Sequence, residues 1–585
     1  MARATNAELA ARFEEFADLL EAQDVEYKPR AYRRAAEAVA AHPAPIADLI
    51  ESGNEEAVEG IEGVGDAISA KIEEYVETGE IEELEGLREE LPVDMAALTR
   101  VEGVGPKTVG TLYEELGVRN LDDLEAAAEA GEIREVKGFG EKTERNIAEG
   151  IEFARTVGER QLLGEARPLA DDVLAFLEGV DAVSRLDVAG SIRRWRETIG
   201  DVDVLVASED GEAVVGAFVG WDSVDDEIES GPEKASVRVG EVRVDLRVVV
   251  PKEFGSALQY FTGSKDHNVR LRNYAIDRGL KVNEYGTFDV NGVEDPDSGQ
   301  RVGERVAGET EEGMYEALDL PWIPPELRED RGEIAAAAAG QLPDLLTRED
   351  VRGDLHTHTD WSDGTTPIEE MVEAAADRGY DYYAIADHAE GPGVVADVGL
   401  SPAEIDDQIA EIRAVDAERE ITVFAGIEAN VDAEGEVDLP EEIVEKLDLV
   451  VASPHSALDQ DSGAATDRLL AAIENPAVDI IGHPSGRLLN QREGLSFDAS
   501  VLGEAAADHG TALEVNANPS RLDLWGSAVQ AAIEAGAKIA IDTDAHRPAT
   551  QEYMRWGVHT ARRGWAEPGD VINCFEEQEL RAFLE

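Results

Sequence analysis

Histidine and acidic residues at the ends of short apolar segments constrain the C-terminal half of this chain most strongly. From residue 351 onward, stretches such as YYAIADH, ITVFAGIE and KIAIDTD alternate with helical patterns, which predicts a barrel-like β/α domain. Polar residues that close these stretches would lie at the carboxyl ends of the strands, where such barrels carry their active sites. The nine residues of this set are His356, His358, Asp363, His388, Glu428, His455, His483, Asp544 and His546.

The composition of this set indicates a metal site. A single histidine is more often a surface or core residue than a ligand, but six of the chain's ten histidines belong to the set. The spacing of two in His356-Thr357-His358 and in Asp544-Ala545-His546 places both outer side chains on one face of an extended strand. Imidazole and carboxylate together suit zinc, manganese or iron. Nine ligands are too many for one ion, so we expect two or three ions bridged by Glu428, a cluster suited to phosphoester hydrolysis.

The chain is very acidic. Its 585 residues include 128 acidic and 52 basic ones, for a net charge of −76, yet 43% are hydrophobic, which favours a folded protein. Molar salt would screen the self-repulsion to within about 3 Å, so we expect a halophilic, archaeal source. The acidity removes the basic patch that usually indicates nucleic-acid binding, but high salt would weaken such a patch in any case.

The cysteine content and the hydropathy of the sequence indicate the cellular compartment of the protein. Cys574 is the only cysteine, so no intrachain disulfide can form and a thiolate metal site is not expected. The sequence contains no apolar run of about 18 residues, and its opening segment MARATNAELA lacks the apolar core of a signal peptide. These features predict a soluble, cytoplasmic protein with no membrane partner.

A glycine motif recurs in the N-terminal part, as IEGVGDAISAKI at 61–72, VEGVGPKTVGTL at 101–112 and VKGFGEKTERNI at 136–147. Each copy has an apolar residue, G-x-G and an amphipathic helix, which is the helix-hairpin-helix pattern. The glycines permit positive φ and close approach, so backbone N–H groups at the helix start can bind a DNA phosphate. One copy often marks only a tight turn, but three predict sequence-independent DNA binding. The expected DNA-contacting glycines are Gly63, Gly65, Gly103, Gly105, Gly138 and Gly140.

Three aspartates on predicted strands indicate a second site. In DVDVLV, Asp201 and Asp203 share one face, and Asp245 lies on the polar face of the strand RVDLR. Three convergent carboxylates are unfavourable unless they hold cations, and two Mg²⁺ ions are the natural occupants. A D-x-D motif alone is common on a solvated strand edge. Here the turn G-S-I-R-R precedes it, on which Ser191 and Arg194 can hold a polyphosphate.

These motifs resemble known families. The order H-x-H, S-D-G, D-H, E, S-x-H, G-H-P, D-x-H resembles the PHP (polymerase and histidinol phosphatase) family, and G-S-x-R-R with the three aspartates resembles the nucleotidyltransferase superfamily. The segment Y-F-T-G-S at 260–264, followed by N-E-Y at 283–285, resembles the nucleotide-binding and thumb region of family X DNA polymerases. Residues 1–325 thus resemble a family X polymerase core, and 351–570 resemble its fused PHP domain.

The resemblance implies roles at the polymerase site. Asp201 and Asp203 would hold two Mg²⁺ or Mn²⁺ ions, and Asp245 would help to deprotonate the primer 3′-hydroxyl. The implied nucleotide-binding residues are Gly190, Ser191, Arg194, Gly200, Tyr260, Phe261, Gly263, Asn268 and Arg272. Of these, the aromatic pair and Gly263 would pack against the incoming sugar, while Asn268 and Arg272 would approach the incoming and template bases.

A lyase role is also implied for the N-terminal region. Lys71 falls where some family members carry a Schiff-base lysine, and Tyr32 and Lys28 fall near other lyase positions. Ala67 departs from the pattern, since a lysine that binds the 5′-phosphate is expected there. A lysine next to I-E-E-Y also suits a solvated helix face, and a Schiff-base lysine needs a depressed pKa.

The predicted fold is a multidomain α/β protein: a helical helix-hairpin-helix region, a nucleotidyltransferase α+β palm with a thumb, and a distorted β/α barrel. The predicted domains are an N-terminal lyase-like helical domain (1–85), a fingers-like helical domain (86–160), the palm (161–250), the thumb (251–325), a helical linker (326–350) and the PHP domain (351–585).

The implied function is gap-filling DNA repair. A monomer would extend primed or gapped DNA with deoxynucleoside triphosphates, and its PHP domain would be a 3′–5′ exonuclease or an abasic-site endonuclease. One alternative is a histidinol-phosphatase-type phosphoesterase with a DNA-binding N-terminal half, although such an enzyme needs neither the helix-hairpin-helix repeats nor the three aspartates. A non-catalytic DNA-binding scaffold is the other alternative, and the complete ligand sets at two sites argue against it.

Overall fold

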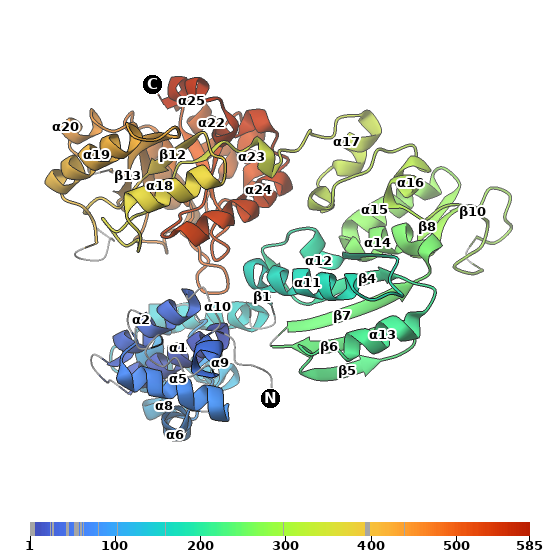
Figure 1. Cartoon of the computed structure of the whole chain (residues 1–585), viewed down its shortest axis with the longest axis horizontal. Helices are drawn as coiled ribbons and strands as arrows, with labels where there is room; N and C mark the ends of the chain where they lie inside the picture. Colours follow the sequence, from blue (N-terminus) through green and yellow to red (C-terminus); the bar gives the residue numbers. More distant parts are fainter. Residues whose placement is uncertain are drawn as a thin grey trace. The chain divides into compact units, whose positions relative to one another are not determined.

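The chain forms two compact units in this computed structural model (Figure 1). The N-terminal unit is Met1–Arg160 with Asn490–Arg492, and the main unit is Gln161–Leu489 with Glu493–Glu585. The described residues are 6–23, 25, 28–41, 46–51, 58, 61, 64–79, 81–101, 103–157, 160–240, 242–296, 298–391, 398–437 and 439–584. Among these residues, no helix is both long and apolar enough to cross a membrane.

The N-terminal unit is helical, as predicted. Its described helices are α1 (Asn6–Ala22), α2 (Lys28–Ala41), α3 (Ile46–Glu51), α5 (Asp66–Thr78), α6 (Glu82–Glu90), α7 (Met95–Leu98), α8 (Pro106–Leu116), α9 (Leu121–Ala130) and α10 (Glu141–Val157). The core contains the ring of Phe16 stacked on that of Tyr32, with centroids 4.3 Å apart. Helix α8 shows how the repeats form: Pro106 fits the first turn because its φ suits a helix start, and Gly117 ends the helix at φ 74°.

The main unit begins with the segment predicted as the palm. Its elements are β1 (Gln161–Leu162), α11 (Leu163–Glu178), β2 (Arg185–Val188), α12 (Gly190–Arg193), β3 (Thr198–Ile199), β4 (Val202–Ala207), α13 (Gly211–Val219), β5 (Asp226–Ser230), β6 (Lys234–Val239) and β7 (Val242–Val249). The five-stranded sheet has the order β2-β4-β7-β6-β5, in which β4 and β7 are parallel. Val202 and Val204 are buried, so the aspartates of this strand lie on the opposite face, as predicted.

The segment predicted as the thumb follows. It comprises α14 (Phe254–Thr262), α15 (Lys265–Ile276), the sheet β10-β9-β8, with β8 (Leu280–Asn283), β9 (Gly286–Asp289) and β10 (Glu304–Ala307), and the helices α16 (Glu311–Glu316) and α17 (Glu333–Ala339). Leu327, Ile334 and Ala337 lie in one buried cluster with Met314 and Tyr315. Much of the segment predicted as a linker therefore packs with the thumb, because its apolar residues recur at helical spacing.

The C-terminal segment confirms the predicted β/α barrel. Its strands are β11 (Gly353–Asp354), β12 (Tyr382–Ile385), β13 (Thr422–Val431), β14 (Leu449–Pro454), β15 (Ile480–Ile481), β16 (Ala512–Asn516) and β17 (Lys538–Asp542). Its helices are α18 (Ile368–Asp377), α19 (Pro402–Asp416), α20 (Glu441–Val444), α21 (Ser462–Ile473), α22 (Ala499–His509), α23 (Gly526–Glu534), α24 (Met554–Arg563) and α25 (Glu577–Leu584). The seven strands are parallel and follow chain order in the sheet. A parallel bridge between Thr357 and Ala545 joins the ends of the first and last strands.

The palm and the barrel share a buried core. Leu522 and Trp556 of the barrel belong to the same apolar cluster as Val188, Ile192 and Trp195 of the palm. The ring centroids of Trp195 and Trp556 are 5.8 Å apart. Two barrel side chains therefore complete the hydrophobic core of the palm.

Candidate active sites

The barrel brings all nine predicted ligands to one rim. His356 and His358 follow β11, His388 follows β12, and Glu428 lies on β13. His455 follows β14, His483 follows β15, and Asp544 and His546 follow β17. Because the carboxyl ends of parallel strands meet at one face, side chains far apart in sequence converge there.

Glu428 lies at the centre of the group. Its Oε2 atom is 2.7 Å from His388 Nδ1, 3.5 Å from His356 Nε2 and 3.6 Å from His358 Nε2. Its Oε1 atom is 3.0 Å from His483 Nε2 and 3.3 Å from His455 Nε2. Both carboxylate oxygens thus face ring nitrogens, an arrangement that a bridging ligand requires.

Two further carboxylates complete the group. Asp363 Oδ2 lies 3.4 Å from His388 Nε2, and Asp363 Oδ1 lies 3.2 Å from His546 Nε2. Asp544 Oδ1 lies 3.2 Å from His358 Nε2. Three overlapping sets in this group, each with its ligand atoms within 4.8 Å of one another, could hold a metal ion.

The donor atoms fit metal ions. Within the described part of the chain, Nε2 of His356, both ring nitrogens of His358 and Nδ1 of His483 are buried without a hydrogen-bond partner. Buried polar atoms normally have one, so unpaired nitrogens beside carboxylates are typical of metal ligands. Although burial lowers it, Glu428 and Asp363 raise the pKa of His388 to about 11. Glu428 and Asp363 therefore favour positive charge at this place, which divalent ions would supply.

Sequence reasoning missed the residues that form hydrogen bonds to these predicted ligands. Glu514 on β16 is fully buried, and its Oε1 atom lies 2.7 Å from His356 Nδ1. Its Oε2 atom accepts a 2.5 Å hydrogen bond from the backbone N–H of His483. The amide of Asn516 donates to Asp544 at 3.1 Å. The available signal was a glutamate between the apolar residues Leu513 and Val515 of a predicted strand, because a buried acid needs a partner.

We expect Glu514→Gln to lower metal affinity or the hydrolytic rate by about 10- to 100-fold, as for other residues that orient a metal-bound histidine. The amide has a single acceptor oxygen, so it cannot accept from both the His356 ring and the His483 backbone N–H as the carboxylate does, and one of these two ligands loses its fixed orientation. The measurement is metal content after dialysis, together with phosphodiester hydrolysis. Glu504→Gln on the exposed side of α22 is the matched control. Unchanged metal content and rate in Glu514→Gln would refute the orienting role.

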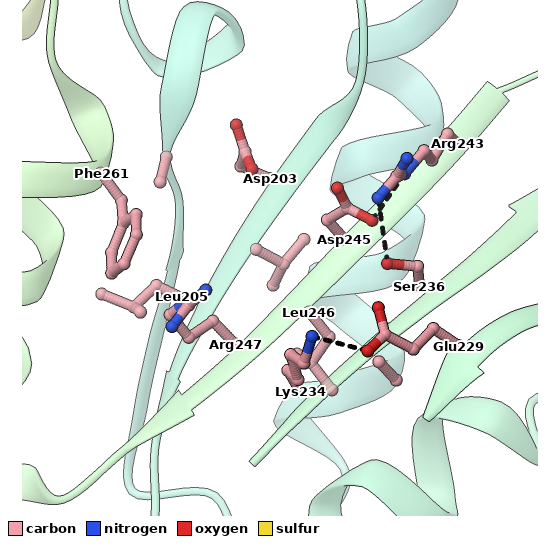
Figure 2. A pocket seen from close by; sticks show the side chains of 13 residues that line it. Asp203, Leu205, Glu229, Lys234, Ser236, Arg243, Asp245, Leu246, Arg247 and Phe261 are labelled. Atoms are coloured by element: carbon pink, nitrogen blue, oxygen red, sulfur yellow. Dashed lines mark hydrogen bonds and ion pairs between the residues drawn. The ribbon is translucent and has the colours of Figure 1, made fainter. Parts of the chain in front are cut away.

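The palm brings the three predicted aspartates together. Asp203 on β4 and Asp245 on β7 are register partners on adjacent parallel strands, and Asp201 directly precedes β4. Ligand atoms of the three carboxylates lie within 4.8 Å of one another. Figure 2 shows Asp203 and Asp245 beside the same cavity, with Arg243 donating to Asp245 at 2.9 Å. The arrangement suits divalent cations with oxygen ligands.

Burial and repulsion mark Asp203 as the most constrained of the three. Burial, followed by the charges of Asp201 and Asp245, raises the pKa of Asp203 to about 7. Gly190, with φ +61°, approaches so closely that a Cβ there would lie 2.0 Å from Asp203 Oδ2. The glycine of the G-S-I-R-R turn is therefore required for the carboxylate to occupy its place.

The predicted nucleotide-binding residues lie around the end of α14. The rings of Tyr260 and Phe261 meet edge to face with centroids 5.1 Å apart. Asn268 donates through Nδ2 to the carbonyl oxygen of Tyr260 at 2.7 Å, and Arg272 is exposed one turn later on α15. Gly263 ends α14 at φ 69°, where a Cβ would lie 3.2 Å from Arg194 Nη1.

The G-S-I-R-R turn supplies the rest of this set. Ser191 lies in α12 beside Gly190, and Gly200 separates β3 from Asp201. Arg194 lies against the end of α14, because its guanidinium donates to the carbonyl oxygen of Thr262. The predicted phosphate-binding residues and the predicted sugar-binding residues therefore meet.

The N-terminal unit contains the remaining predicted sites. Gly65 and Gly105 immediately precede α5 and α8, and Gly140 immediately precedes α10. Gly103 and Gly138 adopt φ of 79° and 101°, as the hairpin turns require. Gly63 lies outside the described residues.

Lys71 is held in an ion pair. Its Nζ atom lies 2.7 Å from Glu83 Oε2, and Lys28 Nζ lies 3.7 Å from Glu83 Oε1. Burial lowers the pKa of Lys71, but Glu83 and Tyr32 outweigh it and raise the pKa above its ordinary value. The predicted lyase residues gather, but Lys71 would have to leave Glu83 before its amine could act as a nucleophile.

Comparison with protein families places known domains along the chain. Residues 4–81 match a helix-hairpin-helix domain, and residues 95–152 match a SAM-like helix-hairpin-helix tandem. Residues 257–329 match the DNA polymerase beta thumb, and residues 354–518 match the PHP domain.

The family matches and the relatives indicate an enzyme. The chain is 34% identical over 565 residues to the DNA polymerase/3′-5′ exonuclease PolX of Bacillus subtilis, and the alignment covers 96% of each protein. It therefore belongs to the PolX family, the family X DNA polymerases that carry a C-terminal PHP domain.

Partial relatives match each half. DNA polymerase lambda of Rattus norvegicus is 26% identical over 350 residues, which is 55% of this chain and 56% of that protein. A probable phosphatase of Caldanaerobacter subterraneus is 32% identical over 210 residues, which is 33% of this chain and 75% of that protein.

Proposed function

We propose that this protein is a gap-filling DNA polymerase whose PHP domain removes nucleotides from DNA 3′-ends. The observation that carries the proposal is the meeting of Asp201, Asp203 and Asp245 beside the G-S-I-R-R turn. The family relationship supports it, since the Bacillus subtilis relative is named a DNA polymerase and 3′-5′ exonuclease. The histidinol-phosphatase alternative is less favoured, because the phosphatase match covers only 33% of the chain.

In the polymerase reaction, the three aspartates would hold two Mg²⁺ or Mn²⁺ ions. Such ions, when bound, neutralise the polyphosphate and activate the attacking hydroxyl. Asp245 would accept the proton of the primer 3′-hydroxyl, and Arg194 with Ser191 would bind the leaving polyphosphate. Tyr260 and the adjacent Phe261 would contact the incoming sugar. Asn268 and Arg272 would approach the bases.

In the PHP reaction, the nine rim residues would hold two or three ions of zinc, manganese or iron, with Glu428 shared between them. Such ions polarise a phosphodiester and provide the nucleophile. Glu514 and Asn516 would keep the ligands oriented. Exonuclease activity is favoured over abasic-site cleavage because the relative's name specifies it.

The N-terminal unit would bind the DNA backbone. Gly65, Gly105 and Gly140 would direct the N–H groups at three helix starts toward phosphate oxygens. A monomer would engage primed or gapped DNA in this way. Lys71 would act as a lyase nucleophile only after losing its contact with Glu83.

The test is a gel assay of a labelled primer on a one-nucleotide-gapped template with Mn²⁺, in roughly molar KCl to screen the acidic surface. We expect extension with deoxynucleoside triphosphates and shortening without them. Shortening alone would leave only the PHP activity. Untouched DNA, together with hydrolysis of small phosphate esters, would refute the proposal in favour of the phosphatase alternative.

A further inference from the structure

Arg194 is held by a carboxylate. Its Nε atom donates to Glu329 Oε1 at 3.1 Å, while its Nη1 atom donates to the carbonyl oxygen of Thr262. The side chains of Arg194 and Glu329 are each only 13% exposed. Because Arg194 is the residue proposed to bind the polyphosphate, the nucleotide and Glu329 compete for the same guanidinium.

Arg563, the last residue of α24 in the PHP barrel, contacts both Arg194 and Glu329. Its Nη1 atom donates to Glu329 Oε1 at 3.1 Å and to the backbone carbonyl oxygen of Arg194 at 2.7 Å. Its side chain is 5% exposed. Burial would raise the pKa of Glu329, but Arg194, Arg563 and Arg196 outweigh it and lower the pKa. Glu329 is therefore a charged carboxylate that accepts hydrogen bonds from Arg194 of the palm and from Arg563 of the barrel.

Helix α24 also supports the residue after Arg194. Trp195 adopts φ 54°, a left-handed conformation that is costly for a bulky side chain. Its ring stacks on His559 of α24, with centroids 3.4 Å apart and an interplanar angle of 5°. The local backbone of the G-S-I-R-R turn thus depends on contacts with the barrel.

We infer that Arg563 is a positioning residue for nucleotide binding at the polymerase site, a role that rests on the proposed polymerase function. When Arg194 turns to the polyphosphate, Arg563 stays beside Glu329 and neutralises it. A buried charge that loses its partner is strongly destabilised. Without Arg563, the ion-pair partners of Glu329 among the described residues would be Arg194 itself and Arg196, which is 3.7 Å away and 42% exposed. Glu329 would then hold Arg194 more tightly.

The experiment measures steady-state primer extension by the full-length protein at varied dTTP on a gapped template. We expect Arg563→Met to raise the KM for dTTP at least about fivefold while kcat changes less than about twofold, within the range of coupling between contacting residues. Glu329→Gln should lower the KM. The double variant should return to the KM of Glu329→Gln, because the competing carboxylate is gone.

Arg562→Met is the matched control. Arg562 lies on the same helix, but its Nε atom donates to Glu326 at 2.7 Å, so this variant leaves the contacts of Glu329 with Arg194 and Arg563 in place. Its KM for dTTP should not change. Primer shortening without nucleotides confirms that each variant is folded. An unchanged KM in Arg563→Met, or a raised KM that persists in the double variant, would overturn the inference alone. Absence of extension by the unmodified protein would overturn the proposed polymerase function as well.

Discussion

Replacing Asp203 with asparagine is expected to abolish primer extension and to leave metal-dependent shortening of DNA intact. Partial burial and the charges of Asp201 and Asp245 raise the pKa of Asp203 to about 7, and a side chain at Gly190 would clash with its carboxylate. Asparagine keeps the shape but removes the charge that would hold divalent ions. Loss of several kcal/mol of charge stabilisation corresponds to a rate lower by at least about 10³-fold. Single-turnover extension on gapped DNA gives the rate.

The control for this change is Asp226→Asn. Asp226 is an exposed residue of the edge strand β5 in the same sheet, outside the triad, so its replacement should leave extension unchanged. If Asp203→Asn also removed DNA shortening while the protein kept its thermal transition, the assignment of two separate sites would be wrong.

The opposite loss is expected for Glu428→Gln. Glu428 contacts ring nitrogens of five histidines, so its charge organises the whole barrel site. An amide presents N–H groups where some of these rings need an acceptor, and it cannot bridge two cations. We expect DNA shortening to fall by at least about 10³-fold, with extension retained. Metal content by atomic absorption should fall in parallel.

Glu434→Gln provides the comparison, because this exposed residue lies in the loop after β13 and is not one of the nine predicted ligands. It should behave as the unmodified protein. Full exonuclease activity in Glu428→Gln with a normal metal content would show that the barrel group is not the hydrolytic site.

The sequence pattern predicted which acidic and histidine residues lie together, because both groups depend on strand geometry. Alternation places Asp201 and Asp203 on one face, and the parallel pairing of β4 with β7 brings Asp245 beside them. The strand-end positions of the barrel ligands follow from the same regularity. The grouping of both sets of candidate ligands could therefore be predicted without knowing the tertiary structure.

The supporting residues could not be predicted in this way. Glu514 acts through histidines that lie 158 and 31 residues away in the chain, and no local pattern specifies those contacts. Glu329 lies 135 residues from Arg194 and 234 from Arg563. The pairing of Lys71 with Glu83 was equally hidden, because a pKa depends on burial and on neighbouring charges in space.

The shared core has a consequence for how this enzyme can change during evolution. Leu522 and Trp556 fill the palm from the barrel side, so deletion of the barrel would expose Trp195 and its neighbours to water. The palm and the barrel, which would carry the synthesis and the removal of nucleotides, therefore depend on the same hydrophobic core to fold. A lineage that no longer needed the nuclease could lose its rim ligands by point substitution, one at a time. Losing the barrel itself would first require a new cover for the polymerase.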